Sequence, residues 1–306
     1  RRQRQMCIRD RGAIQLNKLI PALKKIALQD GANVNVDETW LRYHAYNKKR
    51  KTYMWCLVNR KARIVIFFYE DTTDDEGVQK HGGRNRNVLK EFLGDAKIKS
   101  LQSDGYNVYM YLDNELMDID HLCCLAHARA KFKYAFDQGS PQARIFLEQI
   151  AKLYGMEDTY RREKLTADEI YRRRNSKETT EVIEKIRTEL YDLLANPDEN
   201  RSELMSKALN YLKNFWNQIF AYRNDREYSI DNMAAERAIR PITVQRKNSL
   251  FFGSVKGIQN SAIYNTFIET CKQAGVSFRN YFCKLLRELK KGRTDYENLL
   301  PMTICK

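Results

Sequence analysis

Two acidic residues follow an alternating stretch near the start of the chain, "NVNVDETW" at residues 33–40. Val34 and Val36 predict one face of a β-strand, and Asp37 takes the next position on the opposite face. A carboxylate beside a buried strand is costly unless something compensates its charge. Asp37 is therefore a candidate for chemistry that uses an anionic ligand. Glu38 would point to the other face, as a helper or a surface acid.

Two further acids lie on segments that the pattern predicts to be ordered. Asp104 ends the predicted strand "KIKSLQS", and Glu236 lies in the predicted helix "DNMAAERAIRP". Phosphodiester chemistry with two Mg²⁺ ions needs carboxylates from distant segments, because Mg²⁺ prefers hard oxygen ligands and keeps several waters. Asp37, Asp104 and Glu236 are thus a candidate two-metal site.

Each of these acids also has an ordinary structural explanation. Asp37 could begin a turn or cap another element. Asp104 precedes Gly105, and this pair is common in turns. Glu236 could form a helical ion pair with Arg240. The residues alone do not select this set over the other acids nearby, which are Glu38, Asp113, Asp118, Asp120 and Asp231.

The elements that must position these acids begin with a helix over 13–29. Three strands joined by short polar links follow, over 33–46, 52–59 and 62–70, which is typical of hairpins. The next expected elements are a helix at 85–94, a strand at 97–103, a short helix at 106–116 and a strand end at 121–127. This order predicts an α/β fold, a ribonuclease-H-like mixed five-stranded sheet flanked by helices.

The second half of the chain predicts helices. "SIDNMAAERAIRP" predicts a helix over 229–241, with Asp231 or Asn232 near its N-cap and Pro241 after its end. Two more helices are expected over 259–273 and 278–290, the second capped by Ser277. The expected organisation is a helical lead-in at 12–32, a core over 33–135, a helical insertion at 136–225, the final helical part of the core at 226–275, and a helical tail at 276–306.

The net charge of the 306-residue chain is +15, which predicts a polyanionic partner, most often nucleic acid. A merely basic soluble protein is the alternative. No apolar run is long enough to span a membrane, and no signal peptide is recognisable, which favours a cytoplasmic protein. Seven cysteines without regular spacing predict reduced thiols and no disulfide framework.

The first residues, "RRQRQMCIRD", show no helical or strand periodicity and do not continue into the pattern of the residues after them. Back-translated, residues 1–11 resemble a sequencing adapter, so we expect them to be an artefact of assembly. The gene would then be truncated at its 5′ end. Without these residues the chain loses five arginines and one aspartate and stays basic. The alternative is a genuine basic arm that binds nucleic acid.

Six motifs occur in order over residues 34–276: "VDETWLR", "LQSDGY", "CLAHARAKF", "IDNMAAERAIRP", "RKNSLFFGS" and "IETCKQAGV". Together they resemble the insertion-sequence sixty-six family, a group of bacterial DDE transposases. The resemblance implies a ribonuclease-H-like catalytic core in which Asp37, Asp104 and Glu236 are the catalytic acids and metal ligands. Two Mg²⁺ ions are the implied cofactors, and Mn²⁺ can substitute. Met233 departs from the family pattern, which usually has Asn there.

The function that the resemblance implies is metal-dependent DNA strand cleavage followed by strand transfer. The implied partners are double-stranded DNA of the transposon ends and target, further copies of the chain on that DNA, and accessory transposon proteins, with no membrane. The implied location is the bacterial cytoplasm, at the nucleoid. Family members usually carry a longer N-terminal part with DNA-binding elements. Two alternatives remain: a ribonuclease-H-like nuclease without strand transfer, and a DNA-binding remnant without catalysis.

Basic residues near the predicted site are candidates for phosphate binding, which sets register and makes affinity salt-sensitive. They are Arg237, Arg240, Arg246, Lys247, His127, Arg129 and Lys131. The alternative is a solvated basic face.

A cluster of His121, Cys123, Cys124 and His127 allows a zinc site to be considered. Zinc ligands usually come as two spaced pairs, whereas Cys123 and Cys124 are adjacent and would point to opposite faces of a strand. Buried thiols near a strand end are therefore the favoured interpretation.

Overall fold

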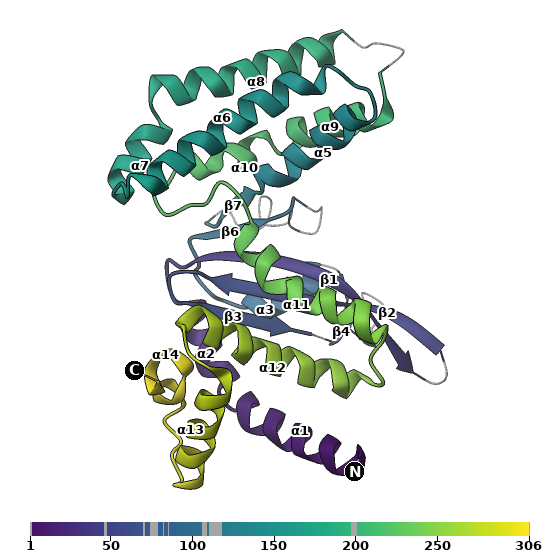
Figure 1. Ribbon diagram of the computed structural model, residues 1–306, viewed down its shortest axis with the longest axis vertical. Coiled ribbons are helices and arrows are strands. Elements are labelled where there is room, and N and C mark those ends of the chain that lie inside the picture. The colour runs from purple at the N-terminus through teal and green to yellow at the C-terminus, as the bar shows by residue number, and fades with distance from the viewer. Residues whose placement is uncertain are drawn as a thin grey trace. The chain divides into compact units, whose positions relative to one another are not determined.

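The computed structural model describes residues 2–45, 48–69, 71–73, 79–81, 83–84, 86–105, 109, 118–196 and 201–305. The chain divides into two compact units (Figure 1). Unit 1 comprises residues 1–101, 107–119 and 233–306, and unit 2 comprises residues 102–106 and 120–232. Most of the short helix expected at 106–116 lies outside the described residues. No helix in the described ranges combines the length and apolar character needed to cross a membrane.

Five strands form a mixed sheet in the order β3-β2-β1-β6-β7. The strands are β1 (Asn33–Ala45), β2 (Lys48–Asn59), β3 (Ile64–Phe68), β6 (Ser100–Ser103) and β7 (Asp120–Cys123). The first three are antiparallel neighbours, and Asp37 lies opposite Cys56 in an unbroken register. A separate two-stranded sheet pairs β4 (Asp71–Thr73) with β5 (Gln79–His81). The predicted α/β architecture with a five-stranded mixed sheet is confirmed.

Both faces of β1 are apolar over part of their length, because side chains alternate along a strand. Val34 and Val36 belong to one core cluster, together with α2 (Ile20–Ala27) and α3 (Arg86–Leu93). Leu41 and Tyr43 belong to a second cluster on the opposite face, formed with α11 (Met233–Ser249) and α12 (Val255–Ala274). The three antiparallel strands of unit 1 are therefore covered on both faces.

The edge of the sheet at β3 is covered by two threonines of α12. Thr266 Oγ1 accepts the N–H of Phe67 at 2.8 Å and lies 3.3 Å from its carbonyl oxygen. Thr270 Oγ1 makes the same pair of contacts with Val65, at 3.1 and 3.0 Å. One helical turn advances about 6 Å over four residues, which matches two residues of strand. The spacing of the threonines thus satisfies the backbone of an edge that would otherwise be open.

Helix α11 continues through Pro241 to Ser249, so the prediction that proline follows the end of the helix is wrong. A proline inside a helix removes one backbone hydrogen bond and costs about 3 kcal/mol. The apolar face of α11 carries Ala238 and Ile239 before the proline and Ile242 after it, all buried against the sheet. Packing on both sides of Pro241 offsets the cost and keeps the helix whole.

The expected helix at 13–29 is two helices, α1 (Arg2–Asn17) and α2, because Pro21 favours a new helix start. Asp10 of α1 contacts α12, with one oxygen 2.8 Å from Lys256 Nζ and the other 2.7 Å from Asn260 Nδ2. The hydrogen bond from Lys256 lowers the pKa of Asp10. Asp10 thus has defined neighbours on α12, and the adapter origin of residues 1–11 stays a prediction. Near its C-terminal end, the described part of unit 1 also contains α13 (Phe278–Lys290), η3 (Tyr296–Leu299) and α14 (Pro301–Ile304).

Unit 2 contains mostly helices. They are α5 (Leu125–Asp137), α6 (Ala143–Arg162), α7 (Ala167–Arg174), α8 (Lys177–Ala195), α9 (Glu203–Asn214), α10 (Trp216–Phe220) and η2 (Ala221–Arg223). Serine and threonine N-caps begin three of them, at Thr166, Ser176 and Ser202. The rings of Phe132 and Phe146 stack at 4.2 Å between α5 and α6.

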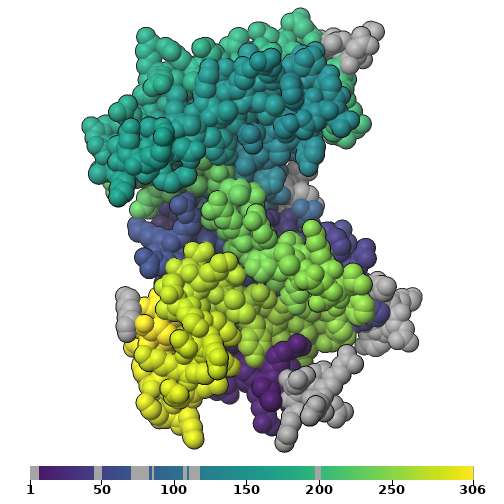
Figure 2. Space-filling model, viewed as in Figure 1, coloured from purple at the N-terminus to yellow at the C-terminus, as the bar shows by residue number. Residues whose placement is uncertain are grey.

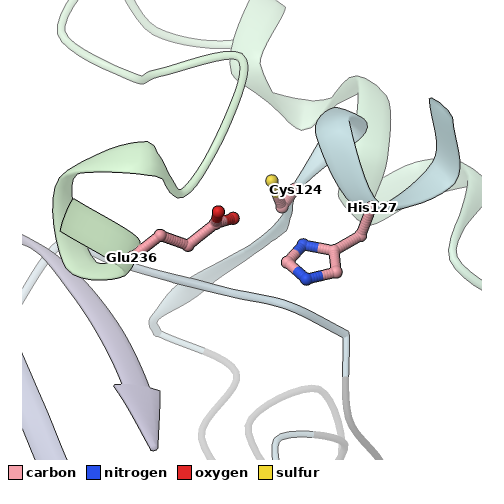
Figure 3. A group of neighbouring side chains, drawn as sticks. All are labelled: Cys124, His127 and Glu236. Atoms are coloured by element: carbon pink, nitrogen blue, oxygen red, sulfur yellow. The ribbon is translucent and has the colours of Figure 1, made fainter. Parts of the chain in front are cut away.

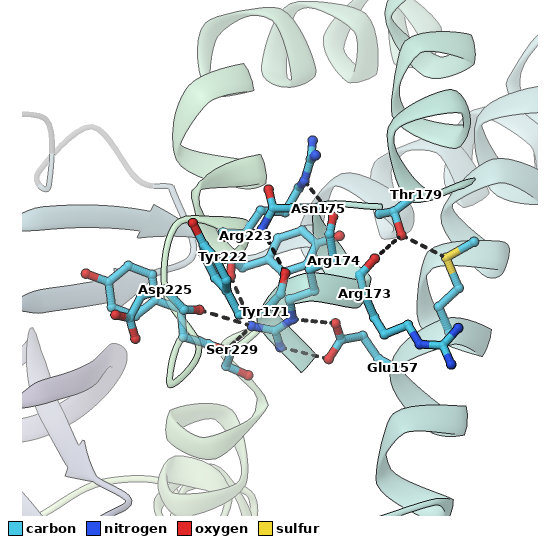
Figure 4. A network of polar contacts seen from close by, with 12 residues as sticks. Glu157, Tyr171, Arg173, Arg174, Asn175, Thr179, Tyr222, Arg223, Asp225 and Ser229 are labelled. Atoms are coloured by element: carbon cyan, nitrogen blue, oxygen red, sulfur yellow. Dashed lines mark hydrogen bonds and ion pairs between the residues drawn. The ribbon is translucent and has the colours of Figure 1, made fainter. Parts of the chain in front are cut away.

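The buried Arg174 binds the segment 222–228, near the end of unit 2, through hydrogen bonds to its backbone (Figure 4). The Arg174 side chain is 6% exposed and donates to both carboxylate oxygens of Glu157, at 2.7 and 2.8 Å. Its Nη1 also donates to the backbone carbonyls of Tyr222 and Tyr228, at 3.0 and 2.9 Å. Charge-assisted bidentate pairs of this kind are strong, and removing one member destabilises the fold because the other stays buried without a partner. Arg174 thus holds the irregular segment 222–228 against α6 and α7.

Replacing Arg174 with alanine is expected to lower the free energy of unfolding by about 3–5 kcal/mol, because Glu157 and two carbonyls would remain buried without their donor. Urea unfolding followed by circular dichroism measures this. Arg172→Ala is the control, because Arg172 is exposed on the same helix, and it should change stability by less than about 0.5 kcal/mol. Equal effects of the two substitutions would contradict the assignment.

Candidate active site

Asp37 lies on the face of β1 that α11 and α12 cover. The alternation along β1 places it on the side of Leu41 and Tyr43, and its side chain is half-buried. Its Oδ1 accepts the backbone N–H of Glu38 at 2.8 Å. Burial raises the pKa of the Cys56 thiol, and the negative charge of Asp37 across the strand pair adds to this shift. The carboxylate therefore lies on the central strand of the sheet, close to Cys56 of the neighbouring strand.

Glu38 lies on the opposite face and is buried there, its side chain 1% exposed. One carboxylate oxygen accepts from Arg84 Nε at 2.8 Å and Nη2 at 2.7 Å, and the other accepts from the Tyr109 hydroxyl at 2.6 Å. The expected orientation of Glu38 is confirmed. It is a buried helper, not a surface acid, and it ties two later segments of unit 1 to β1 directly behind Asp37.

Glu38→Ala is expected to lower the free energy of unfolding by about 3 kcal/mol, because Arg84 and Tyr109 would lose a buried partner. Glu38→Gln should cost less, about 1 kcal/mol, since the amide still accepts from Tyr109 and Arg84 is exposed enough to be hydrated. Thermal and urea unfolding provide the measurements, with the exposed Glu91→Ala as the matched control. If Glu38→Ala matches Glu91→Ala, the structural role of Glu38 is wrong.

Asp104 follows β6 in unit 2, where its backbone and that of Gly105 contact neighbouring side chains. The Asp104 carbonyl accepts from the Tyr211 hydroxyl at 2.7 Å. Gly105 has φ +78°, and a Cβ at that position would lie 2.8 Å from the Tyr211 oxygen, so only glycine fits. Ser103 Oγ accepts the N–H of Gly105 at 3.2 Å. The strand ends at Ser103 as predicted, and Asp104 is a half-buried acid directly after it, whereas the residues that would complete the predicted turn lie outside the described part of the chain.

Sequence patterns identify Tyr211 of α9 only as an apolar position of a helix and do not indicate its contact with Asp104. Burial raises its pKa, and the neighbouring Cys123, Cys124 and Asp104 add to the shift. The Lys131 ammonium group lies 4.8 Å from the centre of the Tyr211 ring. Tyr211 thus links the Asp104 turn to a basic side chain of α5, through contacts between segments more than seventy residues apart.

Glu236 is half-buried in the first turn of α11, in unit 1. A carboxylate is favoured at a helix N-terminus by the helix dipole. Arg246, ten residues further along, donates to Thr39 Oγ1 at 3.1 Å. Ten helical residues span about 15 Å, the length of roughly four or five residues of strand. Helix α11 and strand β1 run in the same direction, and both end near the bridge between Phe252 and Tyr43. Glu236, near the start of α11, therefore lies toward the beginning of β1, as Asp37 does.

The basic residues of α11 fall into two groups. Arg237 and Arg240 are exposed and, with Lys272 of α12, line a hollow of about 670 Å³. Atoms of both helices, in green and yellow-green, are on the face of unit 1 that Figure 2 shows. Arg246 instead stacks on the Trp40 ring at 3.9 Å and donates to the Trp40 carbonyl at 3.0 Å. Burial lowers the pKa of Arg246. Lys247 is exposed at the end of the helix.

Residues with metal-ligating side chains also begin α5 and α11. Figure 3 shows Cys124 and His127 at the start of α5, in unit 2, and Glu236 in unit 1. Cys124 Sγ accepts the backbone N–H of Asn232 at 3.2 Å. His127 is half-buried, and Arg129, on the same helix, is exposed.

The cluster considered as a zinc site has protein partners. His121 Nε2 lies 3.0 Å from Ser103 Oγ and 3.9 Å from Cys123 Sγ. Both Cys123 and Cys124 are buried, which confirms the prediction of buried thiols at the strand end. Within either unit taken by itself, the described residues do not bring three His, Cys, Asp or Glu ligand atoms together.

Residues 5–260 match a family model described as "Transposase IS66 family". This chain belongs to the IS66 transposase family. The match covers Asp37, Asp104 and Glu236, so the family predicted from the six motifs is confirmed. The six motifs in order carried that prediction, and the most specific of them are "DNMAAERAIRP" and the "RKNSLFFGS" that follows it.

Curated relatives come from Sinorhizobium fredii (strain NBRC 101917 / NGR234). The uncharacterized protein y4jD is 28% identical over 212 residues, which are 66% of this chain and 40% of that protein. The uncharacterized protein y4qI is 27% identical over 294 residues, which are 90% of this chain and 51% of that protein. The chain thus spans about half the length of these relatives.

Proposed function

We propose that this chain is the catalytic core of a DNA transposase of the DDE type, with Asp37, Asp104 and Glu236 as its catalytic acids. The observation that carries the proposal is the family match over residues 5–260, which includes all three. The placement of Asp37 and Glu236 on one side of the sheet in unit 1 supports it. Asp104, in unit 2, would complete the set.

The proposed fold is that of ribonuclease H. Three antiparallel strands, then a helix, then the strands β6 and β7, give a sheet whose last two strands lie beside β1 and not beside β3. This arrangement puts β1 in the centre, which is where a catalytic carboxylate is best held, because small misplacements are costly. Helices α6 to α10 would form an insertion between this sheet and α11.

The donor set fits Mg²⁺ or Mn²⁺ better than zinc. All three proposed ligands are carboxylates, which are hard oxygen donors, and each is half-buried, on or directly after a helix or strand. When bound, a pair of such ions would activate the attacking oxygen and stabilise the leaving oxygen. Asp37, Asp104 and Glu236 would hold both ions.

The chain's own residues would position DNA for two successive displacements. Hydrolysis at the transposon end breaks a P–O bond and leaves a 3′-hydroxyl. That hydroxyl then attacks a phosphodiester of the target in line and displaces a new 3′-oxygen. Arg237, Arg240 and Lys272 would hold phosphates of the DNA backbone, while the buried Glu38 network keeps β1 fixed under Asp37. Double-stranded DNA, further copies of the chain and accessory transposon proteins are the proposed partners, at the bacterial nucleoid.

Asp37→Asn, Asp104→Asn and Glu236→Gln are each expected to reduce strand transfer about a hundredfold or more, because each removes a charge that the metal pair needs. The assay joins a 3′-hydroxyl oligonucleotide, taken from the ends of the element that encodes the chain, to a supercoiled plasmid in Mg²⁺ or Mn²⁺. Asp118→Asn is the control, since Asp118 is an exposed acid in the same chain.

Three results would separate the alternatives. Plasmid cleavage without joined product would favour a nuclease. DNA binding with no metal-dependent product would favour an inactive remnant. Full activity in all three acid variants would refute the assigned site.

The double variant Arg237→Ala, Arg240→Ala is expected to weaken duplex binding and to reduce the slope of log K against log salt by about two, because each phosphate contact contributes about 0.9. Fluorescence anisotropy of a labelled duplex over a salt series measures the slope. Arg279→Ala, an exposed arginine of α13, is the control. An unchanged slope in the double variant would show that this hollow does not hold phosphates.

A further inference from the structure

The turn between α11 and α12 presents two adjacent apolar side chains to solvent. Leu250 is 66% exposed and Phe251 is 42% exposed. They belong to the motif "RKNSLFFGS", whose apolar residues the proposed catalysis leaves without a role. Exposure of one apolar residue is ordinary, but two adjacent ones at the tip of a turn are not explained by folding.

The backbone at this tip is strained. Leu250 has φ +57°, in the left-handed region, where a side chain with a Cβ is disfavoured. Glycine would adopt this conformation without strain. The leucine thus costs stability and gains little buried area in return, because it is 66% exposed, and this points to a use for its side chain outside the fold.

The tip is nevertheless held firmly. Directly after it, Phe252 donates its N–H to the Arg42 carbonyl at 2.8 Å and accepts the N–H of His44 at 2.9 Å. Phe252 packs against the core of unit 1. The rings of Phe251 and His44 lie 4.1 Å apart. The apolar tip is therefore attached to the end of β1 through Phe251 and Phe252.

A basic surface leads along α11 to this tip. Arg237, Arg240 and Asn248 line the same hollow, at helical spacing, and Lys247 is exposed in the last turn before Leu250. A polyanion bound along α11 would thus meet apolar side chains at the helix end. Nucleic acid is the polyanion that also has flat apolar faces, namely its bases, and apolar side chains of proteins are known to insert between base steps.

We propose that Leu250 and Phe251 form a wedge that inserts between bases of the bound DNA, while α11 holds the adjacent backbone. The inference rests on the proposed function, because it takes DNA as the substrate. Insertion at this place would unstack bases and separate the two DNA strands beside the last turn of α11. The wedge itself makes and breaks no covalent bond.

The test uses the full chain and a duplex of about 40 base pairs that contains 2-aminopurine at successive positions, without metal. Wild type is expected to raise 2-aminopurine fluorescence at one or two positions. Leu250→Gly and Phe251→Ala should abolish that rise and weaken affinity about tenfold, since one stacked base contributes about that much. Their salt slope should stay that of wild type, because no phosphate contact is lost.

The thermal stability of Leu250→Gly also distinguishes a lost wedge from a chain that fails to fold. Because glycine relieves the positive φ, its thermal midpoint should equal or exceed that of wild type. Leu286→Ala, on α13, is the matched control for removal of an exposed leucine and should leave the fluorescence unchanged.

Several outcomes would overturn the wedge. One is an equal fluorescence rise in wild type and both variants, and another is no rise in wild type. A third is a Leu250→Gly chain that loses self-association in the ultracentrifuge without DNA, which would make the tip a contact between copies. Strand transfer that persists in Asp37→Asn would refute the proposed catalytic site but not the wedge, so the two failures are distinguishable.

Discussion

The alternation of side chains along β1 is the constraint on which the rest of unit 1 depends. Because neighbouring residues face opposite sides of a sheet, Asp37 and Glu38 enter different environments although they are adjacent in the chain. Glu38 is buried and compensated by Arg84 and Tyr109. Asp37 faces the side where α11 begins. A shift of register by one residue would exchange the two acids and bury Asp37 against Arg84.

Helix α11 has two chemically distinct faces. Its inner face, through Ala238, Ile239 and Ile242, attaches the helix to the sheet, and its outer face carries Arg237 and Arg240. Arg246 shows that charge alone does not indicate a ligand-binding role, because its guanidinium stacks on Trp40 and acts as an anchor. The strength of that attachment also explains why Pro241 can remain inside the helix and why the turn after it can hold a strained leucine.

Unit 2 shows how a helical unit can hold irregular segments in place. Arg174 fixes the carbonyls of the segment 222–228, and Tyr211 fixes the carbonyl of Asp104. Both use side chains from the helices to satisfy backbone groups that have no partner in a regular element. The segments that precede Gly105 and Met233 are therefore set by contacts, not by local propensity.

The sequence by itself determined the family, the strand pattern, the opposite orientations of Asp37 and Glu38, and the positive charge, because these depend on local alternation, motif order and composition. It placed α13 and its Ser277 cap correctly for the same reason. It could not determine that α11 passes through Pro241, that the first helix is divided, or that Arg246 is an anchor. Those features depend on packing between residues that are far apart in the chain, such as Ile242 against the sheet and Arg246 on Trp40. Only the tertiary structure also showed that Glu38 is buried and that Leu250 is strained, since burial and backbone angle follow from the neighbours that folding brings together.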